Sequence, residues 1–166
     1  MIVVSDSTPL ISLMKASQLD ILKKLFGDVL IPEAVFSELT TNDAFPKEAA
    51  LIRKSAFIKV VTVSDHKAVS LLQRATGLDR GESEAIVYAD DTHADLLLMD
   101  EVQGRKVAKS MGLPIMGSVG ILINAFRDGL LTEADVETAL NRMKQTGRYI
   151  SDRLIQDALD IVHSEL

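Results

Sequence analysis

Residues 95–101 read DLLLMDE, an uninterrupted apolar run that ends at two acidic residues. Consecutive apolar residues with no polar residue between them are typical of a strand that is buried on both faces, as in a parallel sheet. Residues 2–6 repeat this pattern, because the apolar start Ile2-Val-Val-Ser5 is followed directly by Asp6. Both segments therefore predict a short buried strand with a carboxylate at its end.

Short strands and helices alternate along the rest of the chain. We expect further strands at residues 29–31, 58–63 and 114–116, and the segments between them have helical spacing with proline near their starts and glycine near their ends. The predicted helices cover residues 9–14, 19–26, 32–39, 46–54, 65–76, 101–111, 132–145 and 150–166, with two more that run from the 77–81 turn to about 90 and from the 117–120 turn to about 129. This order predicts an α/β fold, a three-layer α/β/α sandwich with a mostly parallel sheet.

The length and composition of the chain fit one domain with neither disulfide bonds nor a membrane-spanning segment. The 166 residues include no cysteine, which excludes thiolate zinc sites, iron–sulfur clusters and cysteine nucleophiles. We expect a single domain over residues 1–166, in which residues 132–166 form a helical C-terminal extension. The uncharged stretch 110–126 is too short and too polar to span a membrane. No basic leader precedes the first strand, so we expect a cytoplasmic protein.

The negative charge of the chain is concentrated in one segment. Residues 79–101 contain eight acids and one arginine, a charge of −7, whereas the whole chain has a net charge of −6. Such a segment is either a solvated acidic face or a group of carboxylates around a cation. A general nucleic-acid coat is disfavoured, because non-specific binding depends on basic surface.

The placement of two aspartates favours a cation site. Asp6 and Asp100 both follow predicted parallel strands, whose carboxyl ends meet at the same edge of a sheet, where ligands usually bind. Carboxylates that converge within a few ångströms repel one another, and a hard divalent cation relieves that repulsion. Oxygen-only ligands favour Mg²⁺ or Mn²⁺.

Three glutamates are candidates to complete this site. Glu82 and Glu84 are two residues apart on one predicted helix, so at most one of them is expected to face the site. Asp79-x-x-Glu82 matches a capping box, which gives Glu82 a structural role. We therefore select Glu84 and keep Glu82 in reserve. Glu38 lies late in the helix after the second strand and is otherwise an ordinary exposed acid.

Five segments in a fixed order resemble the PIN-domain family, and most of all its DUF3368 group of toxin-like, predicted nucleic-acid-binding proteins. The resemblance extends over residues 2 to about 130. The segments are Val4-Ser5-Asp6-Ser7-Thr8-Pro9-Leu10-Ile11, Glu38, Gly81-Glu82-Ser83-Glu84-Ala85-Ile86, Leu97-Leu98-Met99-Asp100-Glu101 and Gly117-Ser118-Val119-Gly120.

The resemblance implies a single-stranded RNA endonuclease that uses Mg²⁺ or Mn²⁺ held by three or four acids. Carried over by position, the catalytic and metal-binding acids are Asp6, Glu38, Glu84 and Asp100. Glu101 stands where relatives often have a second aspartate, and is a reserve acid. The resemblance further implies the toxin of a type II toxin–antitoxin pair, with RNA as substrate and a small antitoxin protein as partner.

Hydroxyl groups lie beside the predicted acids. Ser7 or Thr8 is expected to cap the helix that begins near Pro9, and the alternative role is to support the carboxylate of Asp6 or a water molecule there. Ser118 stands where relatives usually have threonine. We expect it to cap its helix, whose exposed amides are an alternative phosphate site.

Basic residues near the acidic segments are candidate contacts for the RNA backbone. They are Arg80, Arg105, Lys106 and Lys109, and each has the alternative role of a plain surface charge. An acidic nuclease must still attract a polyanion. Bound metal would offset the local charge, and a partner subunit could add basic groups, so we expect a homodimer.

Two other classes of function compete with a nuclease. The first is a PIN-like module that binds nucleic acid or protein without catalysis. The second is phosphotransfer on an aspartate, which is weakened because Thr8 occupies the position of the second acid found in haloacid-dehalogenase-type phosphatases. Dinucleotide and P-loop enzymes are disfavoured, because the sequence contains neither GxGxxG nor GxxxxGK[ST].

Overall fold

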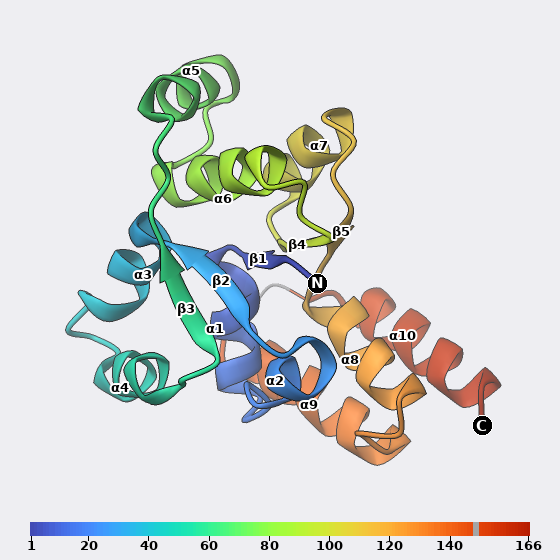
Figure 1. The fold of residues 1–166 in the computed structure, drawn as a ribbon. Helices are drawn as coiled ribbons and strands as arrows, with labels where there is room; N and C mark the ends of the chain where they lie inside the picture. Colours follow the sequence, from blue (N-terminus) through green and yellow to red (C-terminus); the bar gives the residue numbers. More distant parts are fainter. Residues whose placement is uncertain (148–149) are drawn as a thin grey trace.

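A computed structural model describes residues 1–147 and 150–166 of the chain (Figure 1). The helices and strands lie close to the predicted ranges, with boundaries that shift by a few residues at most. In chain order they are β1 (Val3–Ser5), α1 (Ser7–Lys15), α2 (Ile21–Phe26), β2 (Val29–Pro32), α3 (Glu33–Thr40), α4 (Pro46–Lys54), β3 (Ile58–Val61), α5 (His66–Thr76), α6 (Arg80–Asp91), β4 (Leu96–Leu98), α7 (Val102–Ser110), β5 (Ile115–Met116), α8 (Ser118–Arg127), α9 (Glu133–Gln145) and α10 (Asp152–Ser164).

The strands form one five-stranded sheet in the order β3-β2-β1-β4-β5, and every neighbouring pair is parallel. β1 and β4 lie side by side, with Ser5 opposite Leu98. The predicted α/β/α sandwich is confirmed. Because all strands run in the same direction, their carboxyl ends share one edge, and the segments that follow β1 and β4 emerge there together.

Successive residues of the central strands point to opposite faces of the sheet, and each face has its own apolar core. Val3 and Leu98 belong to the larger core, which includes buried residues of α1, α2, α3, α8, α9 and α10. Val4 and Leu97 belong to a second core with residues of α6 and α7. The buried runs in the sequence are thus explained, because both faces of these strands are covered by helices.

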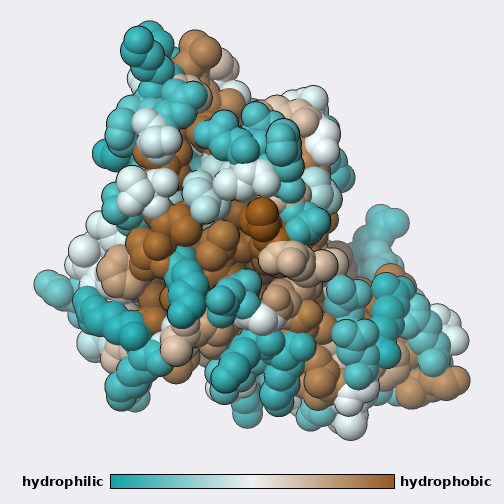
Figure 2. Space-filling view, in the orientation of Figure 1, coloured by the Kyte–Doolittle hydropathy of each residue, from teal (hydrophilic) through white to brown (hydrophobic). Residues whose placement is uncertain are grey.

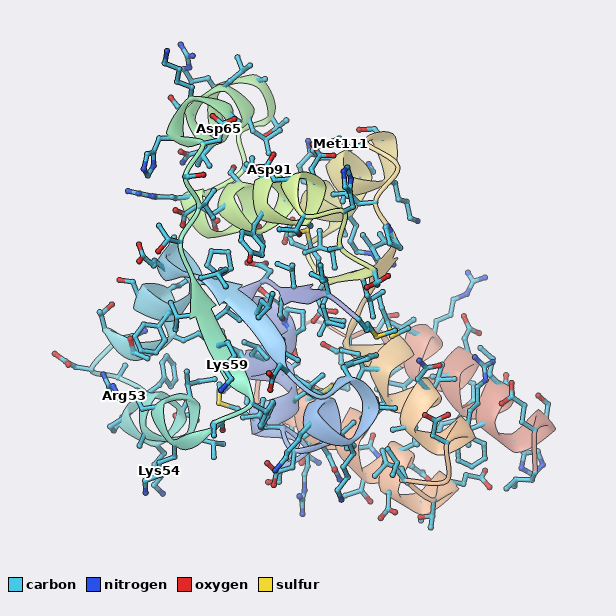
Figure 3. The ribbon with its side chains drawn as sticks, viewed as in Figure 1. Arg53, Lys54, Lys59, Asp65, Asp91 and Met111 are labelled. Carbon is cyan, nitrogen blue, oxygen red and sulfur yellow. The ribbon has the colours of Figure 1, made fainter. Side chains whose placement is uncertain are left out.

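The edge strand β3 carries both a charged residue and an exposed apolar residue. Lys59 projects from the edge strand β3, as Figure 3 shows, and a lysine there disfavours pairing with a strand of another molecule. Val60 on the same strand remains 45% exposed. Figure 2 shows apolar surface gathered over the strands in the middle of this view, between mostly hydrophilic helices.

The C-terminal helices pack against the sandwich. α9 contacts α1 and α8, and α10 contacts α8 and α9, so that Val136, Leu140 and Val162 are fully buried in the larger core. The assignment of residues 132–166 as an extension of the domain stays a prediction. Of the helices in residues 1–147 and 150–166, none has the length and apolar character needed to cross a membrane.

Candidate functional site

Asp6 and Asp100 lie at the carboxyl ends of neighbouring strands. Asp6 follows β1, and its backbone N–H donates a hydrogen bond to the Leu98 carbonyl at 3.0 Å. Asp100 lies two residues after Leu98, the last residue of the neighbouring strand β4. The parallel sheet therefore brings to one edge two aspartates that are distant in the chain.

The Asp6 carboxylate is buried and incompletely bonded. The residue is 2% exposed, and its Oδ1 has no hydrogen-bond partner among the described residues. Burial, with a smaller contribution from the negative charges of Glu82, Glu38 and Asp79, raises the pKa of Asp6 to about 7, against the lowering effect of a hydrogen bond from the Ser7 backbone. A charged Asp6 is therefore costly unless a cation approaches it.

Glu38 and Glu82 come to this edge from different helices. Glu82 lies in the first turn of α6, where it forms the predicted capping box: its Oε2 accepts from the Asp79 N–H at 2.9 Å, and Asp79 Oδ1 accepts from the Glu82 N–H at 2.8 Å. Burial raises the pKa of Glu82, and so do the charges of Asp79, Glu101 and Glu38. Glu38 is an exposed residue of α3. We call Asp6, Glu38, Asp79 and Glu82 the edge cluster.

Glu84 occupies a different environment from Glu82, although both belong to α6. It is 4% exposed, and its Oε2 accepts from the backbone N–H of Ala34, the second residue of α3, at 3.0 Å. Its Oε1 lies 3.8 Å from Nε of Arg80. Residues two apart point about 200° apart around a helix. Glu84 accordingly ties α6 to the start of α3, and it is Glu82 whose charge acts on Asp6.

Gly81 lies at the contact between α3 and α6. A Cβ at this position would make ordinary contacts, 3.5 Å from Val35 Cγ2 and 3.7 Å from Glu38 Oε2. Gly81 and Glu84 are three residues apart and share one side of α6. This side is packed on α3, so the contact between the two helices sets where Glu38 lies relative to Glu82.

The Asp100 carboxylate is held by Ser118 at the start of α8. The Ser118 N–H donates to Oδ1 at 2.7 Å, and the Ser118 hydroxyl donates to Oδ2. A Cβ on Gly117 would lie 2.8 Å from Asp100 Oδ1, so a larger residue there would displace the carboxylate. The expectation that Ser118 caps its helix is wrong: Gly117 is the N-cap residue, and the Ser118 hydroxyl is used on Asp100 instead.

The prediction that Ser7 or Thr8 caps the helix near Pro9 is also wrong. Helix α1 begins at Ser7, and its N-cap residue is Asp6, whose side chain forms no capping hydrogen bond. Thr8 therefore lies inside the helix. It lines a hollow of about 230 Å³ together with Asp100, Glu101 and Ser118, so it remains a candidate supporting residue.

The predicted RNA-binding arginines both have partners within the protein. Arg80 lies beside Glu84, as described above, and keeps a side chain that is 66% exposed. Arg105 Nη1 donates to the Met99 carbonyl at 3.0 Å, next to Gly117. Contacts of either arginine with a substrate stay predictions.

The structure brings part of the predicted site together. Asp6, Glu38 and Glu82 are close enough for their charges to interact. Glu84, although bonded to Ala34, lines with Glu38 and Asp79 a hollow of about 540 Å³, and Asp100, held by Ser118, lies at the same edge of the sheet as Asp6. In the described parts of the chain, no group of three or more acids or histidines is arranged as a ready-made metal site. Sequence reasoning missed Asp79 as a member of the cluster, because the capping box already gave this residue a structural role.

Comparison with known families assigns the fold to a family. The sequence profile of DUF3368, described as PIN domain, matches residues 2–164. The chain belongs to this family. The match reaches beyond residue 130, where the quoted motifs end, and includes α9 and α10. No curated protein matched the sequence. PIN domains are generally nucleases and typically use divalent metal ions.

Proposed function

We propose that this PIN domain is an endoribonuclease that depends on Mg²⁺ or Mn²⁺ and cleaves phosphodiester bonds in single-stranded RNA. The observation that carries the proposal is the buried Asp6 Oδ1 without a partner, surrounded by the negative charges of Glu38, Asp79 and Glu82. A divalent cation would satisfy this oxygen and offset the repulsion. The donors present are all oxygens, which fits these two metals.

Asp6, Glu38 and Asp100 are proposed to hold the metal, with one glutamate of α6. Glu82 is favoured over Glu84, because its charge acts on Asp6 while Glu84 is bonded to Ala34. When bound, the metal would supply Lewis acidity, lowering the pKa of water and offsetting charge on the phosphate during cleavage.

The residues of the chain have separate tasks in this proposal. Asp6 must lose its proton to act as a ligand, and its pKa of about 7 means that this happens near neutral pH. Ser118 fixes the orientation of the Asp100 carboxylate by two hydrogen bonds. Glu84 holds the start of α3 and so positions Glu38.

The biological role proposed with this activity is that of the toxin in a type II toxin–antitoxin pair, acting as a homodimer on RNA. Its support is membership of the DUF3368 PIN-domain family, together with the resemblance of the sequence motifs to toxin-like proteins of that group. Growth arrest on induced expression of the wild-type protein, absent for Asp6→Asn, would support this role. Normal growth with active enzyme present would contradict it.

Cleavage of labelled single-stranded RNA tests the activity. We expect cleavage in Mn²⁺ that stops in EDTA and falls at least about 100-fold in Asp6→Asn, because the metal then lacks a ligand. Asp28→Asn is the matched control: Asp28 is exposed and directly precedes β2, so it lies at the amino ends of the strands and not at the carboxyl ends, where Asp6 lies. Equal cleavage by both variants would point to a contaminating nuclease and contradict the proposal.

A binding module without catalysis is the second candidate. It is favoured by one observation, that the acids of the described residues form no ready-made ligand set. RNA binding with no cleavage in either Mg²⁺ or Mn²⁺ would decide for this candidate.

A further inference from the structure

A small cavity lies beside the edge cluster, between α1, α3, the turn at 41–45 and α4. Its volume is about 250 Å³. Figure 1 shows α4 next to α3, and the two helices are in contact. Apolar side chains of Ile11, Met14 and Leu39 line the cavity together with the ring of Phe45. It is distinct from the hollow that contains Asp100.

The polar groups at this cavity suit a nucleotide. The Phe45 residue is 47% exposed, and Lys15 Nζ lies 5.4 Å from the centre of its ring. Within the described residues, Lys15 forms no ion pair. Asn42 Oδ1 accepts from the Ala44 N–H at 3.0 Å, which leaves the amide NH₂ of Asn42 to donate. An aromatic face, an amide donor and a cation thus line one cavity.

The cavity shares lining residues with the candidate metal site. Glu38, a member of the edge cluster, lines it, and so does Thr8, which also lines the hollow at Asp100. A group bound in the cavity would therefore lie next to a phosphate at the edge cluster. Glu48 adds an acceptor for an amino group.

We propose that this cavity binds one unpaired nucleobase of the RNA strand, with the base against Phe45, an acceptor of the base on the Asn42 amide, and the adjoining phosphate near Lys15. The proposal rests on the proposed function and names where its substrate is read. Base-on-aromatic stacking is the common means by which proteins hold single-stranded RNA. A volume below the 300–1,000 Å³ of pockets for drug-sized ligands favours a single ring system over an extended apolar peptide.

Binding of short RNAs to a cleavage-disabled protein tests this cavity. The Asp6→Asn variant is titrated, by fluorescence anisotropy, with a single-stranded hexanucleotide and with six versions that each lack one base. We expect one position at which loss of the base weakens binding about 10-fold. Adding Phe45→Ala should weaken the complete hexanucleotide by the same factor and abolish the difference between the abasic versions. Phe45→Tyr should restore it, because the ring is retained.

Leu71→Ala is the matched control, since Leu71 is 60% exposed on α5 and does not line the cavity. It should leave all affinities unchanged. Thermal unfolding of each variant shows whether the fold is intact. The proposal is overturned if all six abasic versions bind alike, if Phe45→Ala leaves base dependence intact, or if no hexanucleotide binds. Failure of the nuclease proposal alone appears separately, as wild-type protein that binds RNA through this cavity without cutting it.

Discussion

Two groups of carboxylates in this protein have pKa values that are shifted in opposite directions. Around α8 to α10, Glu165 accepts hydrogen bonds from Arg127 at 2.7 and 2.9 Å, and the guanidinium lowers the pKa of Glu165. Asp135 is bonded to Thr132, which lowers the pKa of Asp135. At the carboxyl edge of the sheet, the pKa values of Asp6 and Glu82 are both raised.

The difference lies in where the compensating charge comes from. The C-terminal carboxylates receive donors from the chain itself, so their ionised forms are favoured. The edge cluster contains acids from β1, α3 and α6 that repel one another, and the nearby Arg80 is at Glu84 instead. An arrangement that costs stability and is not compensated by the chain is typical of a functional site. The following changes test this contrast, in order of expected effect.

Asp6→Asn should stabilise the metal-free protein at high pH. Asp6 keeps its proton up to about pH 7 when folded, but loses it near 3.8 when unfolded. Folding thus takes up a proton between these values, and the free energy of unfolding falls as the pH rises through this window. Asparagine does not ionise, so we expect the variant in EDTA at about pH 8 to be more stable by up to about 4 kcal/mol.

Denaturant unfolding across this pH range measures the effect, with Asp28→Asn as control. The two variants should differ most above pH 7 and converge below pH 4. Parallel curves, with a constant difference at every pH, would mean that Asp6 ionises as easily in the folded protein as in the unfolded chain.

Glu84→Ala should destabilise the protein. It leaves the Ala34 N–H at the start of α3 without its acceptor, and we expect a loss of about 2–3 kcal/mol. Glu84→Gln retains an oxygen acceptor and should lose less. If Glu84 were instead a metal ligand, Glu84→Gln would leave stability unchanged but abolish Mn²⁺ binding.

Ser118→Ala removes one of the two hydrogen bonds to Asp100 while the backbone N–H keeps the other. Hydrogen bonds to charged groups contribute about 1.5–3 kcal/mol, so we expect a loss of stability near the lower value. Under the proposed function, RNA cleavage should fall about 10-fold. Ser118→Thr retains the hydroxyl and should keep most activity. Full activity of Ser118→Ala would show that Asp100 needs no such support.

Glu165→Gln should have the smallest effect. The pair with Arg127 is on the surface, where ion pairs contribute little, because water and salt screen them. We expect a melting temperature close to that of the wild type and unchanged cleavage. A large loss of stability here would remove the contrast between the two groups of carboxylates.

Strand and helix order followed from the sequence because the buried runs at residues 2–5 and 95–99 are bounded by clear turn signals. The edge position of Asp6 and Asp100 followed from the same logic, as did the capping box at Asp79 and Glu82. The sequence did not reveal that Glu84 accepts from Ala34, fifty residues earlier, because such a contact depends on how α3 packs on α6. Ser118 was mistaken for a cap for the same reason, since its partner Asp100 lies on another element.

Calorimetric titration of Mn²⁺ into the metal-free protein at about pH 8 tests most directly whether the edge cluster binds a cation. We predict saturable binding by the wild type, with binding lost in Asp6→Asn, weakened in Glu82→Gln and unchanged in Asp28→Asn. Near pH 7, binding should also release protons to the buffer, because Asp6 must ionise. Equal binding by wild type and Asp6→Asn, or no binding by either, would contradict the account.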